Sequence, residues 1–317
     1  MTWPVNYQSP LLLDGWLEFN QYKWGAKPLR VRLTEGDKDL PAIETVLYLD
    51  KKGRIVQPPL NPYLPVAFQP TPTEKLPHLY RQWASLSKLL VEEFIKRGVK
   101  GSVAFPPEVT DVRQWQWSGF FAEVRYTFYI DFPYNFEIFA SDNRRRQVRK
   151  AMRANFTCEL ATKDLFPEVV ACLKETEIRQ NFITGIGVKD LEAALDFLGQ
   201  DSFLVYICRS SQGEVVSVNI EISAPGMRAI GWLAGTKRSF LDSGATQFLI
   251  WYVLTDLARK GAIGFDFAGA NLSTVSAAKA EWGGRLVPFY VIRPLNIRTL
   301  VAMGVRMLNN LRRRKGK

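Results

Sequence analysis

The segment GFDFAGA, residues 264–270, carries an acid in a short apolar strand that ends in small residues. Small residues let a ligand approach the backbone closely, so we expect this strand end to form the floor of a cleft. The segment is not a dinucleotide loop, because the G-x-G-x-x-G fingerprint lies between the first strand and a helix and has a third glycine. Asp266 is either a catalytic residue of the cleft or a structural residue that caps the next turn or pairs with a cation.

The segment KRSFLDSGAT, residues 237–246, leads from a strand into a helix. Gly244, Ala245 and Thr246 would open that helix, where free backbone N–H groups and the helix dipole favour an anion by about 0.3–1 kcal/mol. Lys237 and Arg238 stand just upstream and could clamp a pyrophosphate. We therefore predict that this helix start binds a phosphate or carboxylate of a ligand. An ordinary capped helix start is the alternative.

The segment SDNRRRQVRKAMRAN, residues 141–155, has a helix start signal followed by a run of cations. Arg145, Arg146 and Arg149 are expected to contact phosphates of a substrate, since each neutralised phosphate adds salt-dependent affinity. A solvated basic helix is the alternative. The formal net charge of +11 is concentrated in this segment and in residues 295–317, while the rest of the chain is close to neutral. Such a distribution is not that of a uniformly basic nucleic-acid binder.

Residues 295–317 are expected to form a basic C-terminal helix whose apolar residues lie on one face. That face would dock on the protein. Alternatively, it would lie on an anionic membrane or bind nucleic acid.

Several familiar kinds of chemistry are excluded by what the sequence lacks. His78 is the only histidine, and neither a G-x-S-x-G elbow nor a G-x-x-x-x-G-K-[ST] phosphate loop is present. Cys158, Cys172 and Cys208 are too widely spaced for a zinc site or a disulfide framework. We expect no metal and no tightly bound cofactor. Reduced cysteines, the lack of a basic signal-peptide region and the lack of a long apolar run together predict a cytoplasmic protein.

The elements that must position these residues alternate between strands and helices, which predicts an α/β fold with a mixed sheet. In the first half we expect strands over 30–35, 43–50, 53–59, 101–105 and 124–132, and an amphipathic helix over 77–97. In the second half we expect helices over 141–154, 165–179, 245–260 and 273–281, a three-strand meander between the second and third of these, and a final strand over 286–293.

The two halves of the sequence resemble each other. A helix, a basic residue, two spaced glycines and a strand recur at 92–105 and 255–268, and a tryptophan turn enters a long strand at 117–132 and 282–294. We interpret this as one duplicated domain, although chance similarity between two helix–strand units would give the same pattern. The predicted division is residues 1–135, residues 136–294 and the C-terminal helix.

Four motifs, taken in order, resemble the Fem-type family of peptidoglycan-bridge aminoacyltransferases and their acetyltransferase-like relatives with tandem GNAT domains. These motifs are the Arg-rich helix start at 141–151, the small-residue helix start at 244–246, the strand GAIGFDFAG at 261–269 and the turn KAEWGG at 279–284. The resemblance covers roughly residues 130–293 and implies two tandem GNAT-like (acyl-CoA N-acyltransferase) domains with an acceptor site in the cleft between them.

The resemblance also implies an activity, namely transfer of an acyl or aminoacyl group to an amine acceptor. Lys279 matches a lysine that lies near the donor in such enzymes, which with Asp266 makes it a candidate catalytic residue. The donor would be acyl-CoA or aminoacyl-tRNA, but the [RQ]-x-x-G-x-[GA] loop that binds CoA is not matched, since the next glycine after Arg238 is Gly244.

The partners implied are a small-molecule or cell-wall-precursor amine acceptor, tRNA, and a membrane surface touched by the C-terminal basic helix. The alternative function is a catalytically inactive GNAT-like scaffold that binds a phosphorylated glycan or RNA.

Overall fold

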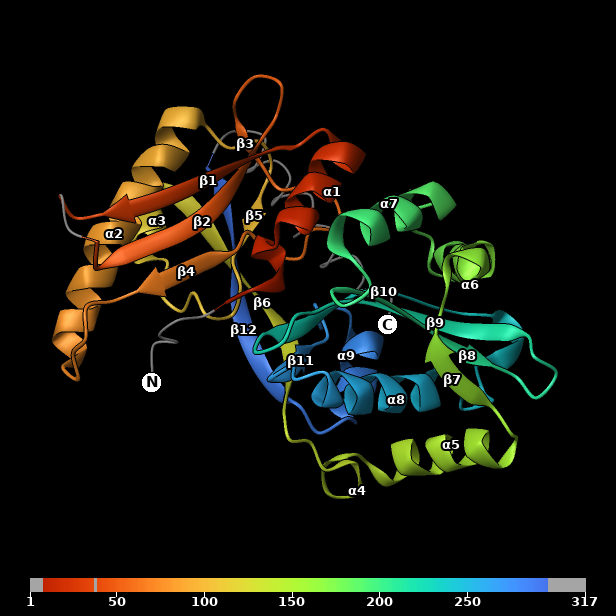
Figure 1. The fold of residues 1–317 in the computed structure, drawn as a ribbon. Helices are drawn as coiled ribbons and strands as arrows, with labels where there is room; N and C mark the ends of the chain where they lie inside the picture. The colour runs from red at the N-terminus through yellow and green to blue at the C-terminus, as the bar shows by residue number, and fades with distance from the viewer. Residues whose placement is uncertain (1–7, 37–38, 296–317) are drawn as a thin grey trace, which may run out of the picture.

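The computed structural model describes residues 8–36 and 39–295 and contains two sheets flanked by helices (Figure 1). The smaller sheet belongs to the first half of the chain and is antiparallel, with β2 pairing with each of the other three strands. Its strands are β1 (Lys27–Thr34), β2 (Ala42–Leu49), β3 (Ile55–Val56) and β4 (Val66–Gln69).

One long helix, α2 (Leu76–Arg97), covers the small sheet and confirms the amphipathic helix predicted at this place. Its buried side chains recur at helical spacing and pack against the strands, so the sheet and the helix share one apolar core. The helix ends at Gly98, whose φ of 71° lies in the region that favours glycine. A short helix, α3 (Arg113–Trp117), packs at the same core through Trp115.

The larger sheet combines strands of both halves in the order β5-β12-β6-β11-β10-β9-β8-β7. Its strands are β5 (Val103–Ala104), β6 (Phe120–Asp131), β7 (Thr157–Leu160), β8 (Phe203–Arg209), β9 (Val215–Ile222), β10 (Arg228–Thr236), β11 (Gly264–Asp266) and β12 (Arg285–Pro294). The strands β6 and β12 run side by side and antiparallel over ten paired residues (Figure 1).

The two repeated units exchange their long strands. In sequence, β5 and β6 of the first half correspond to β11 and β12 of the second, yet β6 pairs with β11 and β12 pairs with β5. Each half therefore completes the sheet of the other, an arrangement with the symmetry that the internal repeat suggests. The predicted division between residues 135 and 136 follows β6 in the chain and stays a prediction.

Helices cover both faces of the large sheet at the end formed by the second half (Figure 1). One face carries α8 (Ala245–Arg259) and α5 (Asp142–Arg153), whose apolar side chains form one core with β8 and β11. The other face carries α6 (Phe166–Gln180) and α7 (Val188–Leu198), joined by α1 (Asp14–Trp24) from the first half. The sequence analysis did not predict α1 and α7.

The remaining helices are the one-turn α4 (Phe136–Phe139), which precedes α5, and α9 (Ser273–Ala280), which follows β11. The apolar run 248–254 is part of α8, as expected for a buried helix. Among the residues described, no helix combines the length and hydropathy that a bilayer span needs. The predicted C-terminal helix and its proposed membrane contact fall on residues 296–317, outside the described part of the chain.

Candidate functional site

The site begins where two neighbouring strands separate. The strands β10 and β11 run parallel and pair over only three residues. Beyond Asp266 the chain leaves β10 and follows β6 instead, since the N–H of Phe267 donates to the carbonyl of Phe128 at 3.1 Å. Strand β10 continues beside β9 to Thr236. The two strands therefore splay apart, and their facing edges are free to line a cavity.

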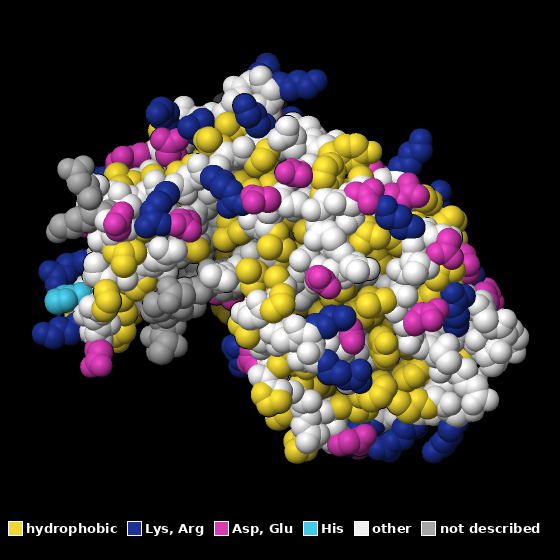
Figure 2. Space-filling view, in the orientation of Figure 1, with side chains coloured by type: hydrophobic (Ala, Val, Ile, Leu, Met, Phe, Trp, Pro, Cys, Tyr) yellow, Lys and Arg dark blue, Asp and Glu magenta, His cyan; other side chains and the backbone are white. Residues whose placement is uncertain are grey.

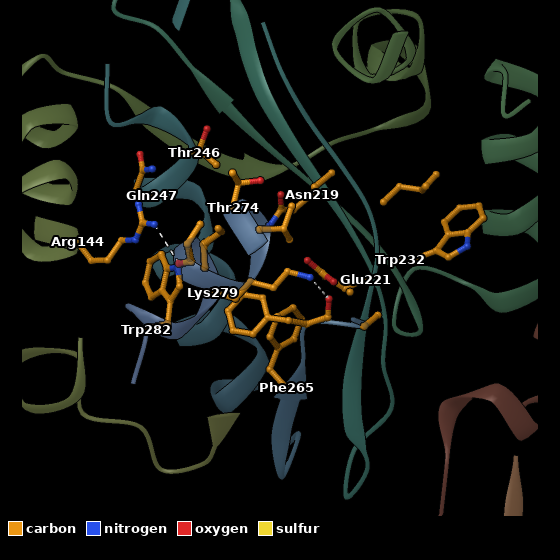
Figure 3. Close-up of a pocket in the computed structure, with 18 of the residues that line it drawn as sticks. Arg144, Asn219, Glu221, Trp232, Thr246, Gln247, Phe265, Thr274, Lys279 and Trp282 are labelled. Atoms are coloured by element: carbon orange, nitrogen blue, oxygen red, sulfur yellow. Dashed lines mark hydrogen bonds between the residues drawn. The ribbon is translucent and has the colours of Figure 1, made fainter. Parts of the chain in front are cut away.

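A cavity of about 520 Å³ fills the space between the splayed strands, with α8 and α9 closing its sides (Figure 3). All its lining residues come from the second half of the chain, so this cavity lies within one half and not between the two halves. The polar side chains that line it are Arg144, Gln180, Asn219, Glu221, Thr246, Gln247, Thr274 and Lys279.

Lys279 extends from α9 to the bottom of this cavity (Figure 3). Its ammonium donates hydrogen bonds to the carbonyls of Phe267 and Gly269, both at 2.6 Å, and lies 5.6 Å from the centre of the Phe267 ring. Burial lowers the pKa of Lys279 to about 8, while the acids Asp266 and Glu221 act in the opposite direction. The structure thus places Lys279 in a cavity of the second half, whereas the resemblance implied a cleft between the two domains. Its catalytic role stays a prediction.

Asp266 ends β11 and is buried, with 1% of its surface exposed. Its carboxylate accepts hydrogen bonds from Thr127 Oγ1 at 2.6 Å and from the N–H of Ala268 at 2.8 Å. Burial raises the pKa of this carboxyl, and these hydrogen bonds oppose the rise. The carboxylate holds the turn that follows the strand, which is the structural role the sequence left open. Its predicted catalytic role stays a prediction.

Glu221 and Asn219 form a polar pair in the cavity wall that the sequence analysis missed. Both lie on β9, a strand whose eight residues are all buried. Burial raises the pKa of Glu221 well above its ordinary value, while Lys279 and the hydrogen bond from Asn219 act against this. The signal that could have found them is an acid and an amide two residues apart in an otherwise apolar strand, because that spacing places both on one face.

A loop from the first half supports the underside of the cavity floor. The backbone carbonyl of Leu60 accepts a hydrogen bond from Trp232 Nε1 at 3.1 Å, and the Tyr63 hydroxyl bonds to Asp266. The ring of Tyr63 also packs edge-on against Phe289, with 5.3 Å between ring centroids. The proline-rich loop of residues 57–64 therefore supports the cavity floor.

The sequence matches no family model and no curated protein. Solved structures are similar to it in fold. The crystal structure of FemX aligns over 95% of both chains with a TM-score of 0.67 and 13% identity. The C-terminal domain of a candidate lysylphosphatidylglycerol synthetase from Agrobacterium fabrum covers 90% of this chain and 89% of its own, with a TM-score of 0.58 and 13% identity. The structure of L-PGS from Bacillus licheniformis covers 92% of this chain and 95% of its own, with a TM-score of 0.54 and 13% identity.

The chain has the Fem-type, GNAT-like fold. This similarity confirms the predicted recognition, and the mixed sheet with its helices confirms the predicted α/β fold class. The four motifs that suggested this fold each contribute residues to the cavity. In this Fem-type fold the short strand and turn of the segment GFDFAGA form the cavity floor, because Phe267 and Ala268 line it. Gly264 is small for another reason, since a Cβ there would lie 2.2 Å from the guanidinium of Arg228.

At the start of α8, where an anion site was predicted, Gly244 and Ala245 do not line the cavity. Gly244 has a φ of 88°, and a Cβ on it would lie 2.3 Å from the carbonyl oxygen of Gln147 in α5. The glycine therefore allows two helices to pack closely. The N–H of Ala245 is bonded to the Ser243 hydroxyl at 3.1 Å, and Thr246 alone of the three predicted residues lines the cavity.

The two upstream cations, Lys237 and Arg238, do not line the cavity. Lys237 pairs with Glu214 at 2.7 Å on the adjacent hairpin. The backbone N–H of Arg238 donates to Glu175 at 2.9 Å, and its side chain is exposed. Anion binding by these residues stays a prediction.

The basic helix α5 presents its predicted phosphate-binding arginines at the surface. Figure 2 shows Lys and Arg side chains along the lower edge of the molecule, over α5, with acidic side chains beside them. Arg149 pairs with Glu137 at 2.7 Å, Arg145 pairs with Asp142, and Arg146 donates to an Asn143 side chain. Contact with phosphates stays a prediction for all three.

Arg144 differs from its neighbours on α5. The sequence pattern does not distinguish it from the other cations of this helix, but the structure buries it, with 8% exposed, in the cavity wall. Its guanidinium pairs with Glu281 at 3.1 Å and donates to the carbonyl of Ala278 at 3.0 Å. This contact ties the basic helix to α9, the helix that carries Lys279.

Proposed function

We propose that this protein is an N-acyltransferase that moves an aminoacyl group from an ester donor to an amine acceptor in the cavity between β10 and β11. The observation that carries the proposal is the buried ammonium of Lys279 at the point where the two strands separate. A splayed strand pair offers a slot for an acyl chain, and a fixed cation near its end stabilises negative charge that develops on a carbonyl oxygen. The similar folds named for FemX and for lysylphosphatidylglycerol synthesis support this class of reaction.

The reaction needs few protein groups. The acceptor amine attacks the ester carbonyl and forms a C–N bond, and the carbonyl oxygen becomes an oxyanion. Collapse of this intermediate breaks the C–O bond to the donor, and the proton lost by the amine passes to the leaving oxygen, directly or through water. Lys279 has three N–H groups, of which the described hydrogen bonds use two. The third is available for the oxyanion.

An aminoacyl ester such as aminoacyl-tRNA is proposed as donor in preference to acyl-CoA. CoA enzymes of this fold hold the pyrophosphate at a glycine-rich helix start, and here the space beside Gly244 that a side chain would enter is filled by the backbone of Gln147. The exposed arginines of α5 would suit the phosphates of a tRNA. The acceptor is proposed to be a small molecule or cell-wall precursor that carries an amine.

Single-turnover transfer tests this function. Label carried by acetyl-CoA or by a mixed pool of charged tRNA would be offered to the protein with a metabolite extract as acceptor. We expect label to move into amide-linked products from charged tRNA alone. Binding of tRNA or of phosphorylated glycans without transfer from any donor would favour the non-catalytic scaffold. Micromolar binding of acetyl-CoA together with acetyl transfer would show that acyl-CoA, and not an aminoacyl ester, is the donor.

A further inference from the structure

Glu221 is a buried acid that the proposed chemistry does not use. It lies on β9 with 1% of its surface exposed, and its Oε2 has no hydrogen-bond partner among the residues that the structure describes. A buried polar atom left without a partner costs about 1–3 kcal/mol, so such an atom in the wall of a cavity is a candidate contact for a ligand. Since Glu221 also lines the cavity, the missing partner is expected to arrive with a ligand.

Space beside this carboxyl is kept open by a glycine. A Cβ built on Gly231 would lie 3.3 Å from Glu221 Oε2, 3.4 Å from the carbonyl oxygen of Asp266 and 3.1 Å from the Phe265 ring. Any other residue at this position would crowd the carboxyl. The groups that meet here are a carboxyl oxygen, a backbone carbonyl and an aromatic ring, all of which attract a cation with N–H donors.

The charges around the cavity floor also lack one cation. Two buried carboxyls, Glu221 and Asp266, interact with one buried ammonium, that of Lys279. The other cation in the wall, Arg144, already has its own partner in Glu281. Buried charges are stable when they are paired, so a further positive charge beside Glu221 would be stabilised here.

We propose that Glu221, with Asn219 beside it and Gly231 leaving the room, forms a subsite for a primary ammonium group of the substrate. This inference rests on the proposed function and deepens it, since it makes the site selective for a substrate that carries a free amino group. The ammonium belongs either to the aminoacyl part of the donor or to a second amine of the acceptor. N-acetylated donors and plain acyl donors would lack the group that Glu221 binds.

Binding of small probes tests the subsite without any need for transfer. The probes are methyl esters of glycine, alanine, leucine and lysine, each compared with its N-acetyl derivative. Calorimetry at pH 7, in buffers of different ionisation enthalpy, measures both affinity and proton release. We expect a free amino ester to bind roughly 10–100-fold more tightly than its acetylated form, because a hydrogen bond to a charged group is lost on acetylation. Protons should be released on binding, because burial raises the pKa of Glu221 and an ammonium beside it lowers that pKa again.

Two variants and one control locate the effect. Glu221→Gln keeps the shape of the side chain and should abolish both the preference and the proton release. Gly231→Ala should weaken binding of the amino esters, because its methyl group would stand over the carboxyl. Glu214→Gln makes the same chemical change on an exposed residue of the same hairpin and should leave the preference intact. Equal binding of both ester forms by the native protein, or a preference that survives in Glu221→Gln, would overturn the proposal.

Transfer assays then assign the ammonium to its source. If it belongs to the donor, N-acetylated aminoacyl-tRNA is a poor substrate for the native protein, and Glu221→Gln removes that discrimination. If it belongs to the acceptor, donor acetylation has little effect and Glu221→Gln raises the KM of the acceptor. Transfer that ignores acetylation and is unchanged in Glu221→Gln contradicts the subsite while leaving the acyltransferase function standing. Absence of transfer with the probe preference intact contradicts the function and leaves the subsite standing.

Discussion

Replacement of Lys279 by methionine tests the proposed role of this residue most directly. Methionine keeps an unbranched stem beside the ring of Phe267 but removes the charge and all three N–H donors. Loss of one positioned donor to an oxyanion typically lowers kcat by about 10²–10³, equivalent to about 3–4 kcal/mol, and we expect an effect of this size in Lys279→Met. The KM of the donor should change little, because the interaction strengthens only as the oxyanion forms.

The same substitution also affects stability, and the structure gives the reason. The ammonium donates to the carbonyls of Phe267 and Gly269, so it holds the turn after β11 as well as facing the cavity. Lys279 therefore contributes to the stability of the fold as well as to the proposed chemistry. Loss of these two bonds should cost about 1–3 kcal/mol in unfolding free energy. Activity must consequently be compared at a temperature where both proteins are folded, as checked by circular dichroism.

A pH profile separates the catalytic role from the structural one. The pKa of Lys279 is lowered by burial to about 8, so the ammonium is mostly protonated at pH 7 and loses its proton just above. If the charged form stabilises the oxyanion, kcat/KM should fall as the pH rises through about 8. That descending limb should vanish in Lys279→Met and move to much higher pH in Lys279→Arg, since arginine stays charged.

The reasoning would be refuted by a particular pattern of results. Turnover by Lys279→Met within about threefold of the native rate would show that no large stabilisation comes from the ammonium. A rise of kcat/KM with pH through about 8, abolished by the substitution, would instead identify neutral Lys279 as a base for the acceptor amine. A descending limb that persists unchanged in Lys279→Met would assign the titration to another group.

Three further predictions follow from other parts of the structure. Gly244→Val should destabilise the protein by about 2–4 kcal/mol in thermal unfolding, because of backbone strain and a steric clash with Gln147. The control Gly213→Val, at a similar φ but in open space, should show the effect of backbone strain alone. Changing Arg145, Arg146 and Arg149 to Gln should reduce the slope of log K for tRNA binding against log salt concentration by up to about one per lost phosphate contact. The control is the double variant Lys51→Gln, Lys52→Gln. An unchanged slope would show that α5 is a solvated surface helix that does not contact phosphates. Glu108→Gln should remove a fall in the free energy of unfolding between about pH 4.5 and 7, worth about 3 kcal/mol. Burial raises the pKa of Glu108 to about 7, so in this range the folded state holds a proton that the unfolded state has lost. Equal pH profiles of denaturant unfolding for the native protein and the variant would contradict this.

The sequence predicted the elements around the site well because each has a strong local signal. The helix α2 has an apolar stripe and a terminal glycine, and α8 is apolar over a length that suits burial, so their periods and ends could be seen in one segment of chain. The floor strand was predicted for the same reason, as a short apolar run between glycines. The placement of Lys279 came from the resemblance to a family motif.

Other features depend on contacts between distant segments and could not be predicted in this way. The burial of Arg144 depends on Glu281, far along the chain, and its own neighbours on α5 give no hint that one arginine of the series faces inward. The reason for Gly244 likewise lies in α5, whose Gln147 occupies the space beside it. The spacing of Glu221 from Asn219 placed both on one face of a strand. That spacing indicates a polar site only when the strand is known to be fully buried, which the sequence did not show.

The exchange of strands explains why a cavity made by one half of the chain depends on the other half. Asp266 ends the floor strand, and the hydroxyl that donates to its carboxylate belongs to Thr127 on β6, a strand of the first half. The turn after Asp266 follows β6 as well, and this is what pulls β11 away from β10. Without β6, the same sequence would have no reason to diverge at this point. The first half therefore creates the gap between the strands, and the second half supplies the charged groups that fill it.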